Sequence, residues 1–309
     1  MKATRQAYGE TLVELGRENP DVVVLDADLS ASTMTRMFGK AFPDRFFNVG
    51  IAEQNLMSVA GGLAAAGKTV FASTFAIFAT GRAFDQVRVS IAHNRLDVKI
   101  AATHSGLTVG EDGASHQALE DIALMRVLPN MTVVVPADAT EAAQAVRAAA
   151  AQPGPFYIRL GRPPVPMLFG PEYRFVLGRA TVLRQGTGVV VFATGHMVAV
   201  ALEAAGILWG EGISAGVVNV STIKPLDVET IVAAAKRCGA AVTVEEHSII
   251  GGLGSAVAEA LCENFPVPLV RVGVRDVFGE SGKPAELLKA YGLSADGVVN
   301  ACREVTKRK

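Results

Sequence analysis

Several features that would narrow the function of this chain are scarce or missing. Its 309 residues include only three cysteines, Cys238, Cys262 and Cys302, with no Cys-x-x-Cys pair and no metal-binding spacing. Such a sparse, odd count excludes a disulfide framework and is typical of a reducing compartment. Charge of one sign is not in excess either, since the formal net charge is -1. Nucleic acid and anionic membrane are therefore poor candidates as partners.

Apolar runs long enough to cross a bilayer are also missing. The most apolar stretches, residues 70–79 and 189–208, are too short or are interrupted by Gly195, His196 and Glu203. A membrane-spanning helix needs about 20 apolar residues. No apolar signal segment follows the first residues. We therefore expect a cytoplasmic protein with no membrane-embedded part.

What the chain does have is apolar side chains in quantity. Half of its residues are apolar and only 19% are charged, so it can bury large cores and still offer apolar surface to a partner. Its length suits two domains rather than one.

Short apolar runs of strand length alternate with longer segments rich in Ala, Leu, Glu and Gln. In the first half these runs are residues 22–25, 46–49, 69–71, 98–102 and 132–135. Continuous apolar strands separated by helices predict a mostly parallel sheet covered by helices on both faces.

The pattern is interrupted once, which divides the chain in two. Six prolines crowd residues 152–178, and proline density is typical of a linker. The alternation resumes near residue 187. We therefore predict an α/β protein with two mostly parallel, three-layer domains, residues 1–165 and 187–309, joined by a proline-rich linker at 166–186.

In open parallel sheets ligands bind beyond the carboxyl ends of the strands. Four segments at these positions carry groups that a plain connector would not need: residues 48–55, 74–78, 103–117 and 157–162. Each also has a purely structural explanation. A glutamate in a first helical turn is favoured by the helix dipole, phenylalanines usually pack in cores, and an arginine can be a solvated surface charge. The third segment favours function, because it holds two of only five histidines.

Four motifs, in this order and at these distances, resemble the C-terminal half of transketolase. They are Asn-Val-Gly-Ile-Ala-Glu-Gln-Asn from Asn48, Ser-Thr-Phe-x-x-Phe from Ser73, Gly-Glu-Asp-Gly-x-x-His-Gln from Gly110, and Arg-Val-Leu-Pro-Asn-Met from Arg126. The resemblance covers the pyrimidine-binding and C-terminal domains, which is nearly the whole chain. It implies transfer of a two-carbon ketol unit from a ketose phosphate to an aldose phosphate, with thiamine diphosphate as cofactor.

The resemblance also implies roles for single residues. Glu53 would bond the aminopyrimidine ring nitrogen of the cofactor, and Phe75 and Phe78 would pack against that ring. Asp112 would hold a hydroxyl of the donor sugar. His116 would bond the substrate carbonyl oxygen and stabilise developing charge.

Further positions match the family less closely. Asp28 matches an acid on the cofactor side. Positions that hold the sugar phosphate are matched by Arg5, Ser32, His104 and Arg159. The chain departs from the family pattern at Ser105, where Asp is frequent, and at Ala114, where Pro is frequent.

One part of the family's site has no counterpart in this sequence. The Gly-Asp-Gly segment that holds the diphosphate through Mg²⁺ does not occur in this sequence. The most similar string, Glu111-Asp112-Gly113, lies in the loop at residues 103–117, which we call the substrate loop because the resemblance implies that it faces the sugar. We therefore expect a second chain to carry the diphosphate and Mg²⁺ site, in an assembly with two copies of each chain. The second domain would serve self-dimerisation. Its Gly251–Ser255 segment lacks the full nucleotide-binding fingerprint and is typical of a tight turn into a helix.

Three other functions stay open at this point. A β subunit of a thiamine-dependent 2-oxoacid dehydrogenase would share both domains and the glutamate, but its substrate has no need of the polar loop at residues 110–117. Half of an enzyme like deoxyxylulose-phosphate synthase would share a similar loop. A non-catalytic assembly subunit would have no need of the polar set that this sequence retains, namely Glu53, His104, Asp112, His116 and Arg159.

Overall fold

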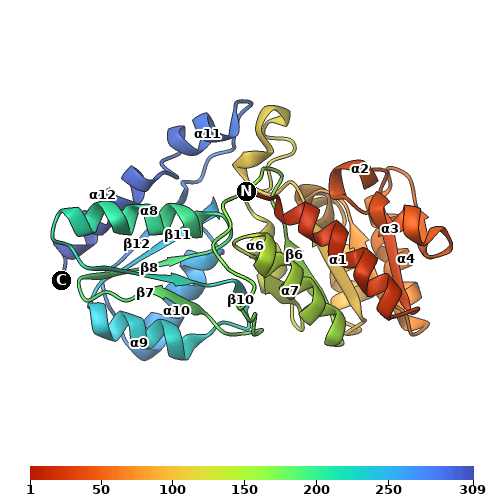
Figure 1. Cartoon of the computed structure of the whole chain (residues 1–309), viewed down its shortest axis with the longest axis horizontal. Coiled ribbons are helices and arrows are strands. Elements are labelled where there is room, and N and C mark those ends of the chain that lie inside the picture. Colours follow the sequence, from red (N-terminus) through yellow and green to blue (C-terminus); the bar gives the residue numbers. More distant parts are fainter.

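The computed structural model describes all 309 residues as two α/β domains, each built on one sheet (Figure 1). The first sheet has seven strands in the order β10-β5-β6-β4-β3-β1-β2. All are parallel except β10, which runs antiparallel to β5. The strands are β1 (Val22–Asp26), β2 (Phe46–Asn48), β3 (Thr69–Ser73), β4 (Val98–Ala102), β5 (Thr132–Val134), β6 (Phe156–Arg159) and β10 (Thr222–Lys224).

The alternation of side chains along β1 shows how this sheet fills two cores. Val22 and Val24 pack into one apolar cluster with α1 and α7, whereas Val23 and Leu25 pack into another with α4 and α6. Both faces of the sheet are therefore covered, which favours strands that are apolar along most of their length. The helical segments of this domain are α1 (Thr4–Glu18), α2 (Ser30–Thr33), α3 (Arg36–Ala41), η1 (Pro43–Arg45), α4 (Glu53–Ala65), η2 (Phe78–Arg82), α5 (Phe84–Gln86), η3 (Val87–Ala92), η4 (Leu107–Asp112), α6 (Asp121–Val127) and α7 (Ala139–Ala151).

The second domain repeats this architecture on a smaller scale. Its five strands lie in the order β12-β11-β8-β9-β7, and only β7 is antiparallel to its neighbour. Helices α8 and α12 lie on one face of the sheet, and α9 and α10 on the other (Figure 1). The elements are β7 (Thr181–Arg184), β8 (Val189–Ala193), α8 (Met197–Gly210), β9 (Ala215–Asn219), α9 (Val228–Cys238), β11 (Ala241–Ser248), α10 (Leu253–Asn264), β12 (Leu269–Val274), α11 (Pro284–Ala290) and α12 (Ala295–Thr306).

The predicted fold class is confirmed, but the two domains are more closely joined than the sequence suggested. β7 lies inside the predicted linker and pairs with β9. β10, which follows β9 in the chain, adds to the edge of the first sheet beside β5. One apolar cluster also runs from Val23 and Val70 in the first domain to Phe192 and Leu253 in the second. The second domain is therefore firmly seated against the first.

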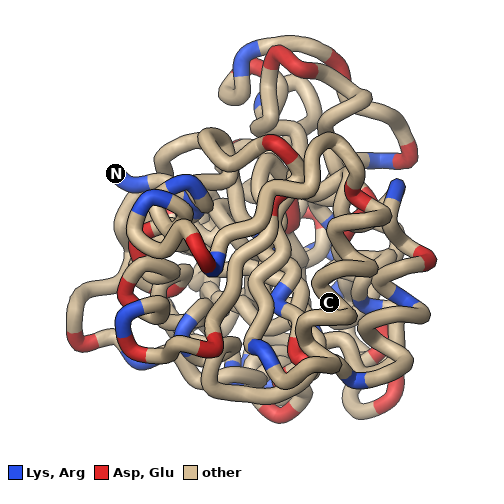
Figure 2. Tube along the Cα trace, turned by 90° about the vertical axis from the view of Figure 1, so that its right-hand side faces the viewer, with Lys and Arg blue, Asp and Glu red and all other residues tan.

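Charges of both signs are interspersed along the part of the chain that Figure 2 brings to the front. No helix has the length and apolarity that crossing a bilayer demands.

Candidate active site

The carboxyl edge of the first sheet gathers most of the residues that the sequence singled out. Glu53 opens α4 directly after the Gly50 turn and is only 3% exposed. The one donor to its carboxylate is Arg82 at the end of η2, whose Nη1 lies 3.0 Å from each oxygen. Arg82 is half-exposed, and its guanidinium covers the ring of Phe78 at 4.6 Å from the centroid. Glu53 and the aromatic pair are thus parts of one site.

Four rings form a continuous aromatic wall. Phe75 and Phe78 are stacked, with centroids 6.0 Å apart and an interplanar angle of 12°. His104 stacks on Phe75 at 3.9 Å, and His116 meets Phe78 edge-on at 5.3 Å. The loop with two histidines therefore folds back onto the aromatic pair.

His104 is held neutral by its surroundings. It follows β4 with a φ of 55°, is 3% exposed, and its Nδ1 lies 2.9 Å from Thr103 Oγ1. Burial, and then the nearby charges of Arg5 and Arg162, lower the pKa of His104 to about 3. A neutral imidazole can offer one N–H to a ligand and accept a proton at the other nitrogen.

Two arginines, Arg5 and Arg162, lie near this imidazole. Arg5 donates from Nη1 to Ser32 O at 2.7 Å and from Nε to Arg162 O at 3.1 Å. Burial and the proximity of Arg162 both lower the pKa of Arg5. Arg162 also lies 3.5 Å from Glu111 and 3.7 Å from Asp112. The two neighbouring guanidinium groups of Arg5 and Arg162 favour a bound anion, because their N–H donors match the geometry of phosphate oxygens.

Arg159 does not belong to this group, and its placement argues against the predicted phosphate role. It is buried on β6, where its Nε and Nη2 lie 2.7 and 3.0 Å from the carboxylate of Asp121. Nη2 also donates to the carbonyls of Ala118 and Glu246. The strand ends at Arg159, and its guanidinium is engaged by these internal partners. Arg162, which the sequence argument did not single out, stands in the same segment and lies beside Arg5.

The remaining predicted residues lie around this edge. Asp28 has a φ of 64° and exchanges two hydrogen bonds with Asn48, at 2.9 and 3.0 Å, which ties the loop after β1 to the start of the Glu53 segment. Ser32 contributes its backbone carbonyl to Arg5. Asp112 stands at the end of η4 with its side chain 43% exposed. No contact joins Asp28 to the aromatic wall.

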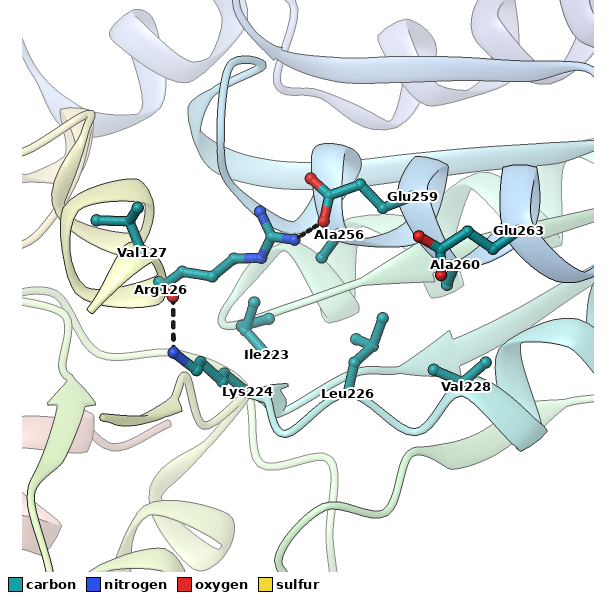
Figure 3. A pocket seen from close by; sticks show the side chains of 10 residues that line it. All are labelled: Arg126, Val127, Ile223, Lys224, Leu226, Val228, Ala256, Glu259, Ala260 and Glu263. Atoms are coloured by element: carbon teal, nitrogen blue, oxygen red, sulfur yellow. Dashed lines mark hydrogen bonds and ion pairs between the residues drawn. The ribbon is translucent and has the colours of Figure 1, made fainter. Parts of the chain in front are cut away.

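The structure has two sizeable hollows, and neither contains Glu53 or the two arginines. One of about 440 Å³ lies between α6, β10 and α10, where Arg126 pairs with Glu259 across the opening (Figure 3). The other, of about 410 Å³, adjoins the substrate loop at Ser115 and Gln117 and is bordered by Phe278. No three His, Cys, Asp or Glu side chains are grouped as a metal site.

Two α/β domains with a buried glutamate beside an aromatic wall are features expected of a thiamine-dependent enzyme. Residues 1–167 match the family model described as the transketolase pyrimidine-binding domain, and residues 178–298 match the transketolase C-terminal domain. The chain therefore belongs to the transketolase family, whose members depend on thiamine diphosphate, and the predicted resemblance is confirmed.

Similar proteins include separate chains of divided transketolases. A solved structure described as a split gene transketolase, an inactive beta4 tetramer, is 60% identical with a TM-score of 0.94, and 99% of each chain is covered. A putative transketolase C-terminal section from Methanocaldococcus jannaschii is 49% identical over all of this chain and 98% of its own length. A 6-deoxy-6-sulfo-D-fructose transketolase subunit from Clostridium sp. is 46% identical over 99% of this chain and 95% of its own length.

Proposed function

We propose that this chain is one subunit of a thiamine-diphosphate-dependent transketolase that transfers a two-carbon ketol unit from a ketose phosphate to an aldose phosphate. The observation that carries the proposal is the convergence of Glu53, the aromatic wall, His104 and two arginines at one sheet edge. A flat heterocycle and a sugar with an anionic group would together use all of these side chains.

The donor set fits the aminopyrimidine half of the cofactor. The buried carboxylate of Glu53 can hold a proton at the ring nitrogen. Phe75 and Phe78 offer the ring an apolar surface. When bound, thiamine diphosphate supplies the carbon nucleophile for the ketose carbonyl. His116 would hold the carbonyl oxygen as charge develops there, and Asp112 would orient a donor hydroxyl.

The anionic end of the sugar is assigned to Arg5, Arg162 and His104. A relative acts on a sulfonated fructose, and a sulfonate presents oxygens to a guanidinium much as a phosphate does. We therefore propose a phosphorylated sugar as substrate, in the pentose phosphate pathway, and treat a sulfonated sugar as the competing possibility.

The diphosphate and Mg²⁺ are assigned to a partner chain with a Gly-Asp-Gly segment, in a cytoplasmic heterotetramer with two copies of each subunit. Support comes from the missing Gly-Asp-Gly string and from relatives that are sections or subunits over nearly the same length. Mg²⁺ requires hard oxygen ligands in octahedral arrangement, which a partner would supply.

The proposal is tested by purifying the tagged chain from its native cells, identifying the chain that accompanies it, and assaying the complex with thiamine diphosphate and Mg²⁺. We expect a partner with Gly-Asp-Gly, and ketol transfer that the Glu53→Gln variant of the same complex lacks. A lipoyl acyltransferase in the complex would point to a 2-oxoacid dehydrogenase instead. Near-normal transfer by Glu53→Gln would contradict the role of Glu53, and no accompanying chain would contradict the two-chain site.

A further inference from the structure

The second domain holds the substrate loop, residues 103–117, through a carboxylate that no motif marks. Glu246 stands in β11 and is 3% exposed. Its Oε1 accepts the backbone N–H of Thr108 at 2.6 Å. Its Oε2 lies 3.3 Å from His196 Nδ1 of the same domain. A hydrogen bond to an ionised acceptor is among the stronger polar contacts in a protein.

The loop is shaped around this carboxylate. Gly106 has a φ of +75°, and a Cβ built on it would lie 2.3 Å from Glu246 Cδ. Any other residue would be strained by the backbone and would also collide with the carboxylate. Two loop positions, Gly106 and Thr108, are thus fitted to one side chain from the other domain.

The opposite end of the loop is held by the same domain. Gln117 Nε2 donates to Glu280 O at 2.9 Å. A Cβ on Gly113 would lie 2.5 Å from Ser281 Oγ, so these two segments of the chain approach closely there too. Asp112 and His116 lie on the stretch between the Glu246 contact and the Glu280 contact. The second domain therefore fixes both ends of the segment that faces the sugar.

We propose that Glu246 is a positioning residue: by holding the N–H of Thr108, it sets the place of His104, Asp112 and His116 relative to the substrate. The inference rests on the proposed transketolase function and gives the second domain a task beyond self-association. Catalytic groups must keep their positions closely, because small displacements cost large factors in rate.

The test compares Glu246→Ala and Glu246→Gln in the assembled complex. In Glu246→Ala we expect kcat/KM for the ketose phosphate to fall by about tenfold or more, as for loss of a buried charged acceptor. The affinity for thiamine diphosphate should stay unchanged, because Glu53, Phe75 and Phe78 lie on other segments. Glu246→Gln keeps an oxygen that can accept the same N–H, so its kcat/KM should stay within about threefold of the wild type.

Glu245 provides a matched control on the same strand. It is equally buried, but its oxygens accept from Leu253 N and Gly254 N, each at 2.7 Å, at the start of α10. Glu245→Ala should lower stability without changing kcat/KM of the folded complex. If Glu246→Ala behaves like Glu245→Ala, or if Glu246→Gln is as damaged as Glu246→Ala, Glu246 is merely structural and the inference is overturned.

A second readout separates this inference from the proposed function. Hydrogen exchange of residues 103–117 in the free chain should accelerate in Glu246→Ala and not in Glu245→Ala.

If Glu246→Ala does not fold, Gly106→Ala disturbs the same contact from the loop side. Gly212→Ala, at a φ of +78° with open space around it, controls for backbone strain. A wild-type complex without ketol transfer would overturn the proposed function. Even if the wild-type complex shows no ketol transfer, the hydrogen exchange still tests the anchoring. Unchanged exchange of residues 103–117 in Glu246→Ala would overturn the anchoring by Glu246, whereas faster exchange would support it.

Discussion

Arg82 Nη1 is placed symmetrically between the two carboxylate oxygens of Glu53, 3.0 Å from each. Glu53 is buried and accepts no other hydrogen bond, while Arg82 is half-exposed and lies over Phe78. The pair therefore keeps the carboxylate compensated in the free chain. A ring nitrogen arriving at Glu53 has to share the carboxylate with Arg82 or displace it, and the exposed guanidinium has room to move.

The first prediction is that Glu53 and Arg82 are energetically coupled in the free chain. The free energies of unfolding of Glu53→Gln, Arg82→Ala and the double variant should be non-additive by about 1 kcal/mol. Removing either partner already abolishes the pair, so the second change costs less. Urea unfolding of the four proteins measures the coupling. Arg88→Ala is the control, because Arg88 is exposed and forms no ion pair. Additive losses for Glu53 and Arg82 would contradict the pairing.

The second prediction concerns the anionic end of the substrate. Arg162→Ala should raise KM for the sugar phosphate by about tenfold or more and affect kcat less, because the contact is present in both the ground state and the transition state. Arg174→Ala, which removes a surface guanidinium bonded to Pro171 O and Tyr173 O, should leave both constants unchanged. Steady-state kinetics of the assembled complex decide this. A fall in kcat alone would show that Arg162 serves another purpose.

The third prediction is that Arg159 acts on stability. Burial alone would raise the pKa of Asp121, but the Arg159 guanidinium holds it below its usual range. Arg159→Ala leaves this buried carboxylate without its partner and should destabilise the chain by about 3–5 kcal/mol.

Changing both residues, as Arg159→Met with Asp121→Leu, should recover much of the loss, because the uncompensated charge is then gone. Urea unfolding gives the free energies. A stable Arg159→Ala variant with a raised KM for the sugar phosphate would restore Arg159 as the phosphate ligand.

The sequence predicted most strands of both sheets because continuous apolar runs mark strands buried on both faces, but it missed β7 and β10. It also brought together Glu53, Phe75, Phe78 and His116, since each follows a strand and all such ends meet at one edge. Our proposal of Arg162 in place of Arg159 uses the residue at which β6 ends, and apolar periodicity leaves that boundary uncertain by a few positions.

Contacts between the domains were beyond the reach of the sequence. β10 has three residues, and its pairing with β5 in the other domain depends on how the two domains pack. The bond from Thr108 N to Glu246 joins residues that are 138 positions apart. Local propensity contains no information about such a pair, so only the structure could supply it.

The last prediction uses the neutral state of His104. Its pKa in the folded chain is lowered to about 3, whereas a histidine in an unfolded chain titrates near about 6.5. The unfolded chain therefore takes up this proton first as the pH falls. The stability that depends on neutral His104 is complete above about pH 6.5 and is lost progressively below it, by up to about 1.4 kcal/mol per pH unit until the folded pKa is reached.

Replacing this imidazole with a group that does not titrate should flatten that dependence. His104→Gln should lose unfolding free energy less steeply than the wild type between pH 6.5 and pH 5, even if it is less stable at pH 7.5. The exposed His93 is the control, and His93→Gln should keep the slope of the wild type. Urea unfolding at pH 7.5, 6.5 and 5.5 gives the slope of the unfolding free energy against pH for the wild type, His104→Gln and His93→Gln. Equal slopes for His104→Gln and the wild type would mean that the folded chain takes up the proton on His104 as readily as the unfolded chain does, which would contradict the lowered pKa.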